Sequence, residues 1–135
     1  MRMLFVLARL PEPEVNIVIR DQDGEVIRRY DSGFRAARLA FEYDGRHHAP
    51  VVDPAYVPLD TVHRTQPSQW RKDLRRREES DAEGWRIVVF VNEDLTVDPA
   101  GTLERARRAM IAAGIPARIR SSEWRRYFGG RPALR

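Results

Sequence analysis

The stretch 38–48 constrains the fold more than any other part of the chain. Its apolar and small or acidic side chains alternate in the order Leu39, Ala40, Phe41, Glu42, Tyr43 and Asp44. A period of two predicts a β-strand, and it would place Glu42 and Asp44 on one face of that strand. Asp44-Gly45 is typical of a strand end, and two histidines follow at once. This density of acid, base and ligand groups indicates a candidate site, although a solvated edge strand followed by a turn has the same pattern.

The residues before this stretch predict a helix and two more strands. In order, we expect a helix over 1–10, a strand over 15–20, a turn at 21–24, a strand over 25–30 and a connection over 32–37. No capping residue precedes the helix, so we expect its first turns to lie upstream of Met1. Asp31 is placed at the end of the second strand. Three antiparallel strands in meander order would then carry Asp31 and Glu42 on neighbouring strands.

The second half of the chain predicts helices around one very hydrophobic strand. We expect a long loop or insertion over 49–67 (most clearly 49–62), a helix from about 67 to 83, a strand over 85–91, a polar loop over 92–100, a helix over 101–113 and a tail over 115–135. The 85–91 strand is predicted to be the buried centre of the sheet.

The last helices are predicted to pack through a small set of apolar side chains. On the 101–113 helix, the residues expected to face inward are Leu103, Ala106, Met110 and Ile111. In the tail, helical spacing of Trp124, Tyr127 and Phe128 predicts a short packed helix.

Composition limits the class of protein. The chain of 135 residues has the length of one domain and contains no cysteine, which excludes disulfides and thiolate metal sites. No apolar run approaches the roughly 20 residues of a membrane-spanning helix, so we expect a cytoplasmic protein with no membrane partner. The net charge of +4 favours polyanions, and the 67–83 helix carries a basic cluster that would hold a phosphate backbone or simply form a solvated face: Arg71, Lys72, Arg75 and Arg76.

The acidic residues resemble a known nuclease signature. Asp31, followed eleven residues later by Glu42-Tyr43-Asp44-Gly45-x-x-His48, resembles the PD-(D/E)xK signature of the restriction-endonuclease-like superfamily. More narrowly, four segments are similar to very-short-patch-repair-like proteins of unassigned function: Phe41–His48, Gln69–Arg76, Gly84–Val89 and Ser122–Arg126. The resemblance implies an α/β (α+β) fold, a restriction-endonuclease-like core ordered helix, three-strand meander, helix, strand, helix, with a mixed central sheet flanked by helices.

The resemblance also implies roles for individual residues. Asp31 and Glu42 would bind Mg²⁺ or Mn²⁺, which takes hard oxygen ligands and promotes phosphodiester hydrolysis. Asp44 stands where the family usually has lysine, so it would be a further metal ligand or a proton acceptor. His48, and less securely His47, would act as acid or base near neutral pH, or would be ordinary surface histidines in a turn.

Three functions are compatible with this resemblance. The first is a magnesium-dependent DNA endonuclease or nickase acting in DNA repair or defence. The second is a catalytically inactive nuclease-fold module that binds DNA or acts as an antitoxin-like regulator, and the third is a remnant without activity. DNA is the expected partner, and the resemblance also allows a homodimer, a toxin or another protein partner.

Overall fold

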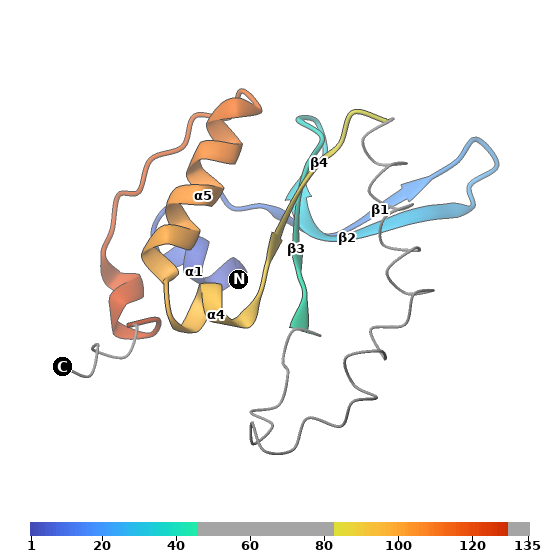
Figure 1. The fold of residues 1–135 in the computed structure, drawn as a ribbon. Helices are drawn as coiled ribbons and strands as arrows, with labels where there is room; N and C mark the ends of the chain where they lie inside the picture. Colours follow the sequence, from blue (N-terminus) through green and yellow to red (C-terminus); the bar gives the residue numbers. More distant parts are fainter. Residues whose placement is uncertain (46–82, 130–135) are drawn as a thin grey trace, which may run out of the picture.

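The computed structural model describes residues 1–45 and 83–129 (Figure 1). Its elements are α1 (Arg2–Leu7), β1 (Glu14–Arg20), β2 (Val26–Phe34), β3 (Leu39–Tyr43), β4 (Arg86–Phe90), α4 (Asn92–Thr96), α5 (Pro99–Ala112) and the 3₁₀ helix η2 (Glu123–Arg126). The four strands form one sheet in the order β1-β2-β3-β4. The first three strands form an antiparallel meander, and β4 is parallel to β3. The predicted α+β class, meander and mixed sheet are therefore confirmed, while the loop over 49–67 and the helix over 67–83 lie almost wholly outside the described residues.

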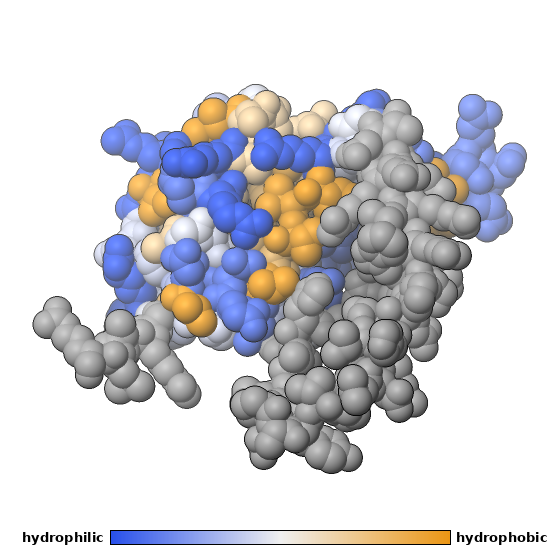
Figure 2. All heavy atoms as spheres, viewed as in Figure 1, coloured by the Kyte–Doolittle hydropathy of each residue, from blue (hydrophilic) through white to orange (hydrophobic). Residues whose placement is uncertain are grey.

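The β1–β2 hairpin forms at the predicted Asp-Gly turn. The Asp21 carboxylate accepts hydrogen bonds from the backbone N–H groups of Asp23 (2.9 Å) and Glu25 (3.0 Å). Gly24 adopts a φ of 83°, which an L side chain rarely tolerates. These local contacts reverse the chain, and the hairpin extends from the rest of the sheet as a two-stranded ribbon with a hydrophilic tip (Figures 1 and 2).

The main core lies between the sheet and the helices α1 and α5 (Figure 1). At its centre, the rings of Phe5, Phe41 and Phe90 meet with centroid distances of 5.3 to 6.3 Å. Edge-to-face and offset contacts of this kind add to the stabilisation that comes from apolar burial. The buried residues of α5 are Pro99, Thr102, Leu103, Ala106, Ala109 and Met110. The prediction was wrong for Ile111, whose side chain is 48% exposed.

A smaller cluster covers the other face of the sheet. Ala40 alternates with Leu39 and Phe41 along β3, so it lies on the face away from the main core. It packs there with Ile17, Tyr30 and Trp85, and the rings of the last two lie 4.8 Å apart. Both faces of the central strand are therefore buried, which explains why three successive residues of β3 are solvent-inaccessible.

Predictions for the second half of the chain also need correction. Residues 92–100, predicted as a loop, contain α4 and the first two residues of α5. The strand over 85–91, predicted as the centre, is an edge strand of the described sheet, and Figure 2 shows hydrophobic surface over it. In the tail, the predicted helix is the short 3₁₀ helix η2, which buries Trp124 and ends before Tyr127. Phe128 packs against the main core as predicted, whereas Tyr127 is 65% exposed. No helix within the described part is long and apolar enough to cross a membrane.

Candidate functional site

The sequence placed Asp31 at the end of the second strand. In the structure Asp31 lies inside β2, three residues before its end. The β2–β3 ladder pairs Phe34 with Leu39 and continues to Ser32 opposite Phe41. One residue further along each strand are Asp31 and Glu42. The register thus places the two predicted residues opposite each other on neighbouring strands, at one end of this ladder.

The Asp31 carboxylate fixes the geometry at this point. Its Oδ2 atom accepts a hydrogen bond of 2.8 Å from the backbone N–H of Tyr43, the residue that follows Glu42. A side chain therefore replaces a backbone carbonyl as the acceptor for β3. Asp31 is exposed, and within the described residues it has no ion-pair partner and no second hydrogen bond. No described residue therefore competes with an external ligand for its Oδ1 atom.

An irregularity in the hairpin marks the same position. The β1–β2 register pairs Val15 with Ser32 and Ile17 with Tyr30, and leaves out Asn16 and Asp31 between them. Asn16 has a φ of 52°, a left-handed conformation that asparagine adopts more readily than most residues. The regular pairing of β2 with β1 is therefore interrupted where the Asp31 side chain reaches across to β3.

Glu42 and Asp44 are held by β4, the neighbour of β3 on the side away from β2. Glu42 is half-buried, is paired with Val89 of β4, and shares its strand face with Ala40 by alternation. Asp44 is also half-buried, and its backbone N–H donates to the carbonyl of Phe90 at 2.8 Å. The parallel ladder thus extends one residue beyond β3 and holds the backbone of Asp44.

Part of the predicted site is not brought together by this geometry. Among residues 1–45 and 83–129, no three His, Asp or Glu side chains form a group that would hold a metal ion. The described candidates are the two neighbouring-strand carboxylates, Asp31 and Glu42, with Asp44 beyond them. Outside the described residues lie the predicted residues His47, His48, Arg71, Lys72, Arg75 and Arg76.

A supporting network behind β4 was missed by the sequence analysis. Asp94 of α4 accepts a hydrogen bond from the backbone N–H of Val91 at 2.8 Å and pairs with Arg105 of α5 at 3.3 Å. Arg105 also donates to the carbonyl of Val89 at 3.2 Å and lies 5.0 Å from the centre of the Phe90 ring. The network holds the end of β4 that pairs with Glu42. The Asp98-Pro99 pair was an available signal for the α5 helix start, since aspartate is a preferred N-cap and proline a preferred first residue.

A further ion-pair group lies on the outer surface of α5. The Arg107 guanidinium, hydrogen-bonded to Glu104 at 2.5 Å, lowers the pKa of that carboxyl to about 2, and Arg108 contributes as well. These residues lie on the helix surface and touch neither Asp31 nor Glu42 in the described contacts.

The chain matches no protein-family model, and neither the curated proteins nor the solved structures show a match to it.

Proposed function

We propose that the protein is a magnesium-dependent DNA endonuclease or nickase with a restriction-endonuclease-like core. The observation that carries the proposal is the placement of Asp31 and Glu42 on adjacent antiparallel strands, with the Asp31 carboxylate anchored to the backbone of Tyr43. The sheet supports it as well, because the resemblance implies a three-strand meander and a further strand in one mixed sheet, and β1 to β4 have this arrangement.

The donor set fits a hard divalent cation. Mg²⁺ is usually held by one or two carboxylates and keeps several waters, so a pair of carboxylates suffices without a third protein ligand. Asp31 offers the Oδ1 atom of an exposed side chain, and Glu42 offers a half-buried carboxylate from the next strand. A cation bound there would neutralise charge on a phosphodiester and lower the pKa of a bound water.

The chain's own residues would position these groups. The Tyr43 N–H restricts the rotation of the Asp31 carboxylate, so its orientation is set before any ligand binds. The Asp94–Arg105 network fixes β4, and through the β3–β4 pairing it limits movement of the Glu42 backbone. Asp44, whose backbone N–H is hydrogen-bonded to Phe90 of β4, would accept a proton or assist metal binding. Beyond the described residues, His48 is the proposed acid or base, and Arg71, Lys72, Arg75 and Arg76 are the proposed phosphate contacts.

Calorimetric titration with Mg²⁺ and Mn²⁺ tests the metal site directly. We expect saturable binding to the wild type that is lost in Asp31→Asn and in Glu42→Gln. The asparagine amide in Asp31→Asn still presents an oxygen to the Tyr43 N–H, so this substitution removes the charge and keeps the strand contact. Asp23→Asn, at the exposed hairpin turn, is the matched control and should bind as the wild type does.

Cleavage of supercoiled plasmid and of mismatched duplexes tests the activity. We expect metal-dependent nicking that both site variants abolish and the Asp23→Asn control retains. Metal binding with no cleavage, but with salt-sensitive DNA binding, would favour the inactive DNA-binding module instead. Cleavage that survives in both Asp31→Asn and Glu42→Gln would refute the assignment of these carboxylates.

A further inference from the structure

Exposed arginines without acidic partners gather on the end of α1 and on the segment that follows α5. Elsewhere in the described structure arginines are usually paired, and those that form ion pairs are Arg2, Arg28, Arg35, Arg105, Arg107 and Arg108. Within the described contacts, five exposed arginines have neither an ion pair nor a hydrogen bond from their side chain: Arg9, Arg118, Arg120, Arg125 and Arg126. We call these five residues the basic strip.

The backbone directs the first part of the basic strip toward solvent. The segment 115–120 runs along α5 on the side away from the sheet, and its half-buried and exposed side chains alternate (Figure 1). The half-buried residues, which pack against the main core, are Ile115, Ala117 and Ile119. Arg118 and Arg120 therefore lie on the outer side of the segment. The backbone N–H of Arg120 donates to the carbonyl of Ala8 at 3.0 Å, which places Arg9 beside this part of the strip.

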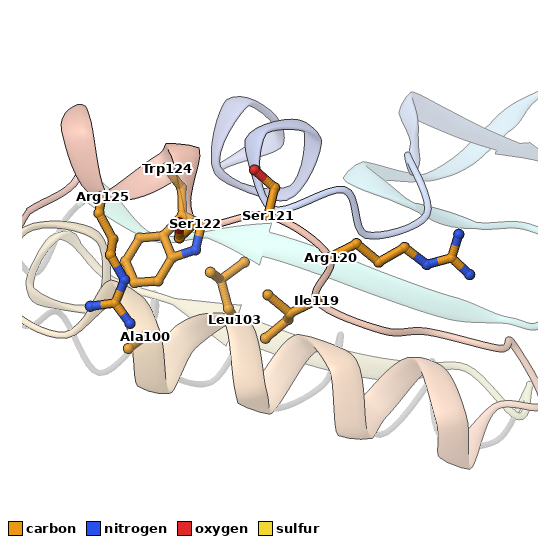
Figure 3. Close-up of a pocket in the computed structure, with 8 residues that line it drawn as sticks. All are labelled: Ala100, Leu103, Ile119, Arg120, Ser121, Ser122, Trp124 and Arg125. Atoms are coloured by element: carbon orange, nitrogen blue, oxygen red, sulfur yellow. The ribbon is translucent and has the colours of Figure 1, made fainter.

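Arg125 and Arg126 continue the basic strip onto η2. The Arg125 guanidinium lies 4.7 Å from the centre of the Trp124 ring, and this ring is fixed in the core with only 5% of Trp124 exposed. In Figure 3 Arg125 lies beside Trp124 while Arg120 extends away from it, so the charges are spread along the segment. Residues 115–129 contain four arginines and a single acidic residue, Glu123. An extended anion therefore suits this surface better than a compact one.

An exposed aromatic ring follows these arginines directly. Tyr127 comes immediately after η2 and is 65% exposed. Its backbone N–H donates to the carbonyl of Trp124 at 3.1 Å, and the next residue, Phe128, packs against the main core. The backbone of Tyr127 is therefore held in place while its ring is open to solvent. Unpaired nucleic-acid bases stack on aromatic rings, and the forked donors of arginine suit phosphate oxygens.

We propose that the basic strip and Tyr127 bind a single strand of nucleic acid. The phosphates of the strand would pair with the arginines, and one unpaired base would stack on the Tyr127 ring. An acidic protein segment would satisfy the arginines but has no flat bases for the exposed ring. The inference does not depend on the proposed nuclease activity, because none of these residues belongs to the Asp31–Glu42 site and binding would need no metal.

Fluorescence anisotropy of the full chain with a labelled single-stranded DNA of roughly 15 nucleotides tests the proposal. The titration is made in EDTA, where we expect saturable binding that weakens with salt. Asp31→Asn should bind as the wild type does, which separates this result from any failure of the metal site.

Neutralising two arginines of the strip tests where the DNA binds. Arg118→Gln combined with Arg120→Gln should weaken binding about five- to tenfold and reduce the salt slope by about 1.4, or roughly 0.7 for each lost phosphate contact. The matched control is Arg107→Gln combined with Arg108→Gln, which removes the same charge from α5, where both arginines pair with Glu104. The control should change the affinity less than about twofold. Equal weakening in the two double variants would overturn the proposal, because net charge alone would then explain the binding.

Tyr127 variants test the stacking contact. Tyr127→Ala should weaken binding of the single strand at least about fivefold and leave binding of a blunt duplex unchanged, whereas Tyr127→Phe keeps the ring and should bind as the wild type does. All substituted residues except Arg107 are exposed, and unchanged Tm values would confirm that the variants fold. Absence of binding at low salt, equal affinities of Tyr127→Ala and Tyr127→Phe, or displacement by polyglutamate as effective as by unlabelled DNA would each overturn the proposal.

Discussion

Arg105 is expected to stabilise the exposed edge of the sheet, and Arg105→Ala tests this role. In the β3–β4 ladder, Arg86 and Phe90 direct their backbone groups toward β3, so alternation turns the carbonyl of Val89 toward the outer edge. Arg105 reaches that carbonyl from α5 at 3.2 Å. A side chain that covers the outer edge of a strand also blocks pairing with another chain. Removing Arg105 should therefore weaken the sheet and uncover this part of β4.

The size of the effect follows from three contacts. The pair with Asp94 at 3.3 Å is partly exposed and should contribute about 0.2–1 kcal/mol. The stacking on Phe90 adds about 0.5–1 kcal/mol, and the hydrogen bond to Val89 about 0.5–1.5 kcal/mol. Because one side chain makes all three and they are not additive, we expect a loss of about 1–2 kcal/mol, or roughly 3–7 °C in Tm for a domain of this size.

Urea unfolding and native-state hydrogen exchange measure this loss. Arg108→Ala is the matched control, because Arg108 lies one turn along α5, is 76% exposed and pairs only with Glu104 in the described contacts. It should cost less than about 0.5 kcal/mol. In Arg105→Ala we expect faster exchange of the Asp44 amide, which bonds to Phe90. Equal losses in the two variants, with unchanged exchange at Asp44, would refute the role assigned to Arg105.

Two further predictions concern single carboxylates. In EDTA, Asp31→Ala should lower the free energy of unfolding by about 1 kcal/mol, because the Tyr43 N–H loses its acceptor. Asp31→Asn should stay near the wild type, and equal losses in the two variants would argue against the hydrogen bond. The pKa of Glu104 is lowered in the folded state to about 2 from 4.5, so its stabilising effect is present above pH 4.5 and is lost as the pH falls toward 2. The Tm difference between wild type and Glu104→Gln should therefore shrink over that range, and a constant difference would contradict the linkage.

The meander was predictable because its signals are local. Side-chain alternation identified β1 and β3, and the Asp21–Gly24 turn carries its own hydrogen bonds, so neither depends on distant contacts. The α4 helix was not predictable in this way, since five residues with no apolar period give no helical signal. It is held from outside, by the hydroxyl of Thr102 on the carbonyl of Asp94 at 2.7 Å. Local patterns thus specify the elements that stabilise themselves, and tertiary contacts specify the rest.

The sequence correctly placed Asp31 and Glu42 on neighbouring strands, but it did not reveal how far β2 extends or what the Asp31 carboxylate contacts. Asp31-Ser32-Gly33 has the composition of a turn, which ended the predicted strand too early. In the fold, Gly33 is needed because a Cβ atom there would lie 2.1 Å from the carbonyl oxygen of Leu39, so the glycine permits the close approach of β2 to β3. That approach continues the ladder to Ser32 and places the Asp31 carboxylate within reach of the Tyr43 N–H. The three residues that have the composition of a turn therefore continue β2 alongside β3. Whether such a segment forms a turn or a strand depends on the pairing with β3, which the local sequence does not reveal.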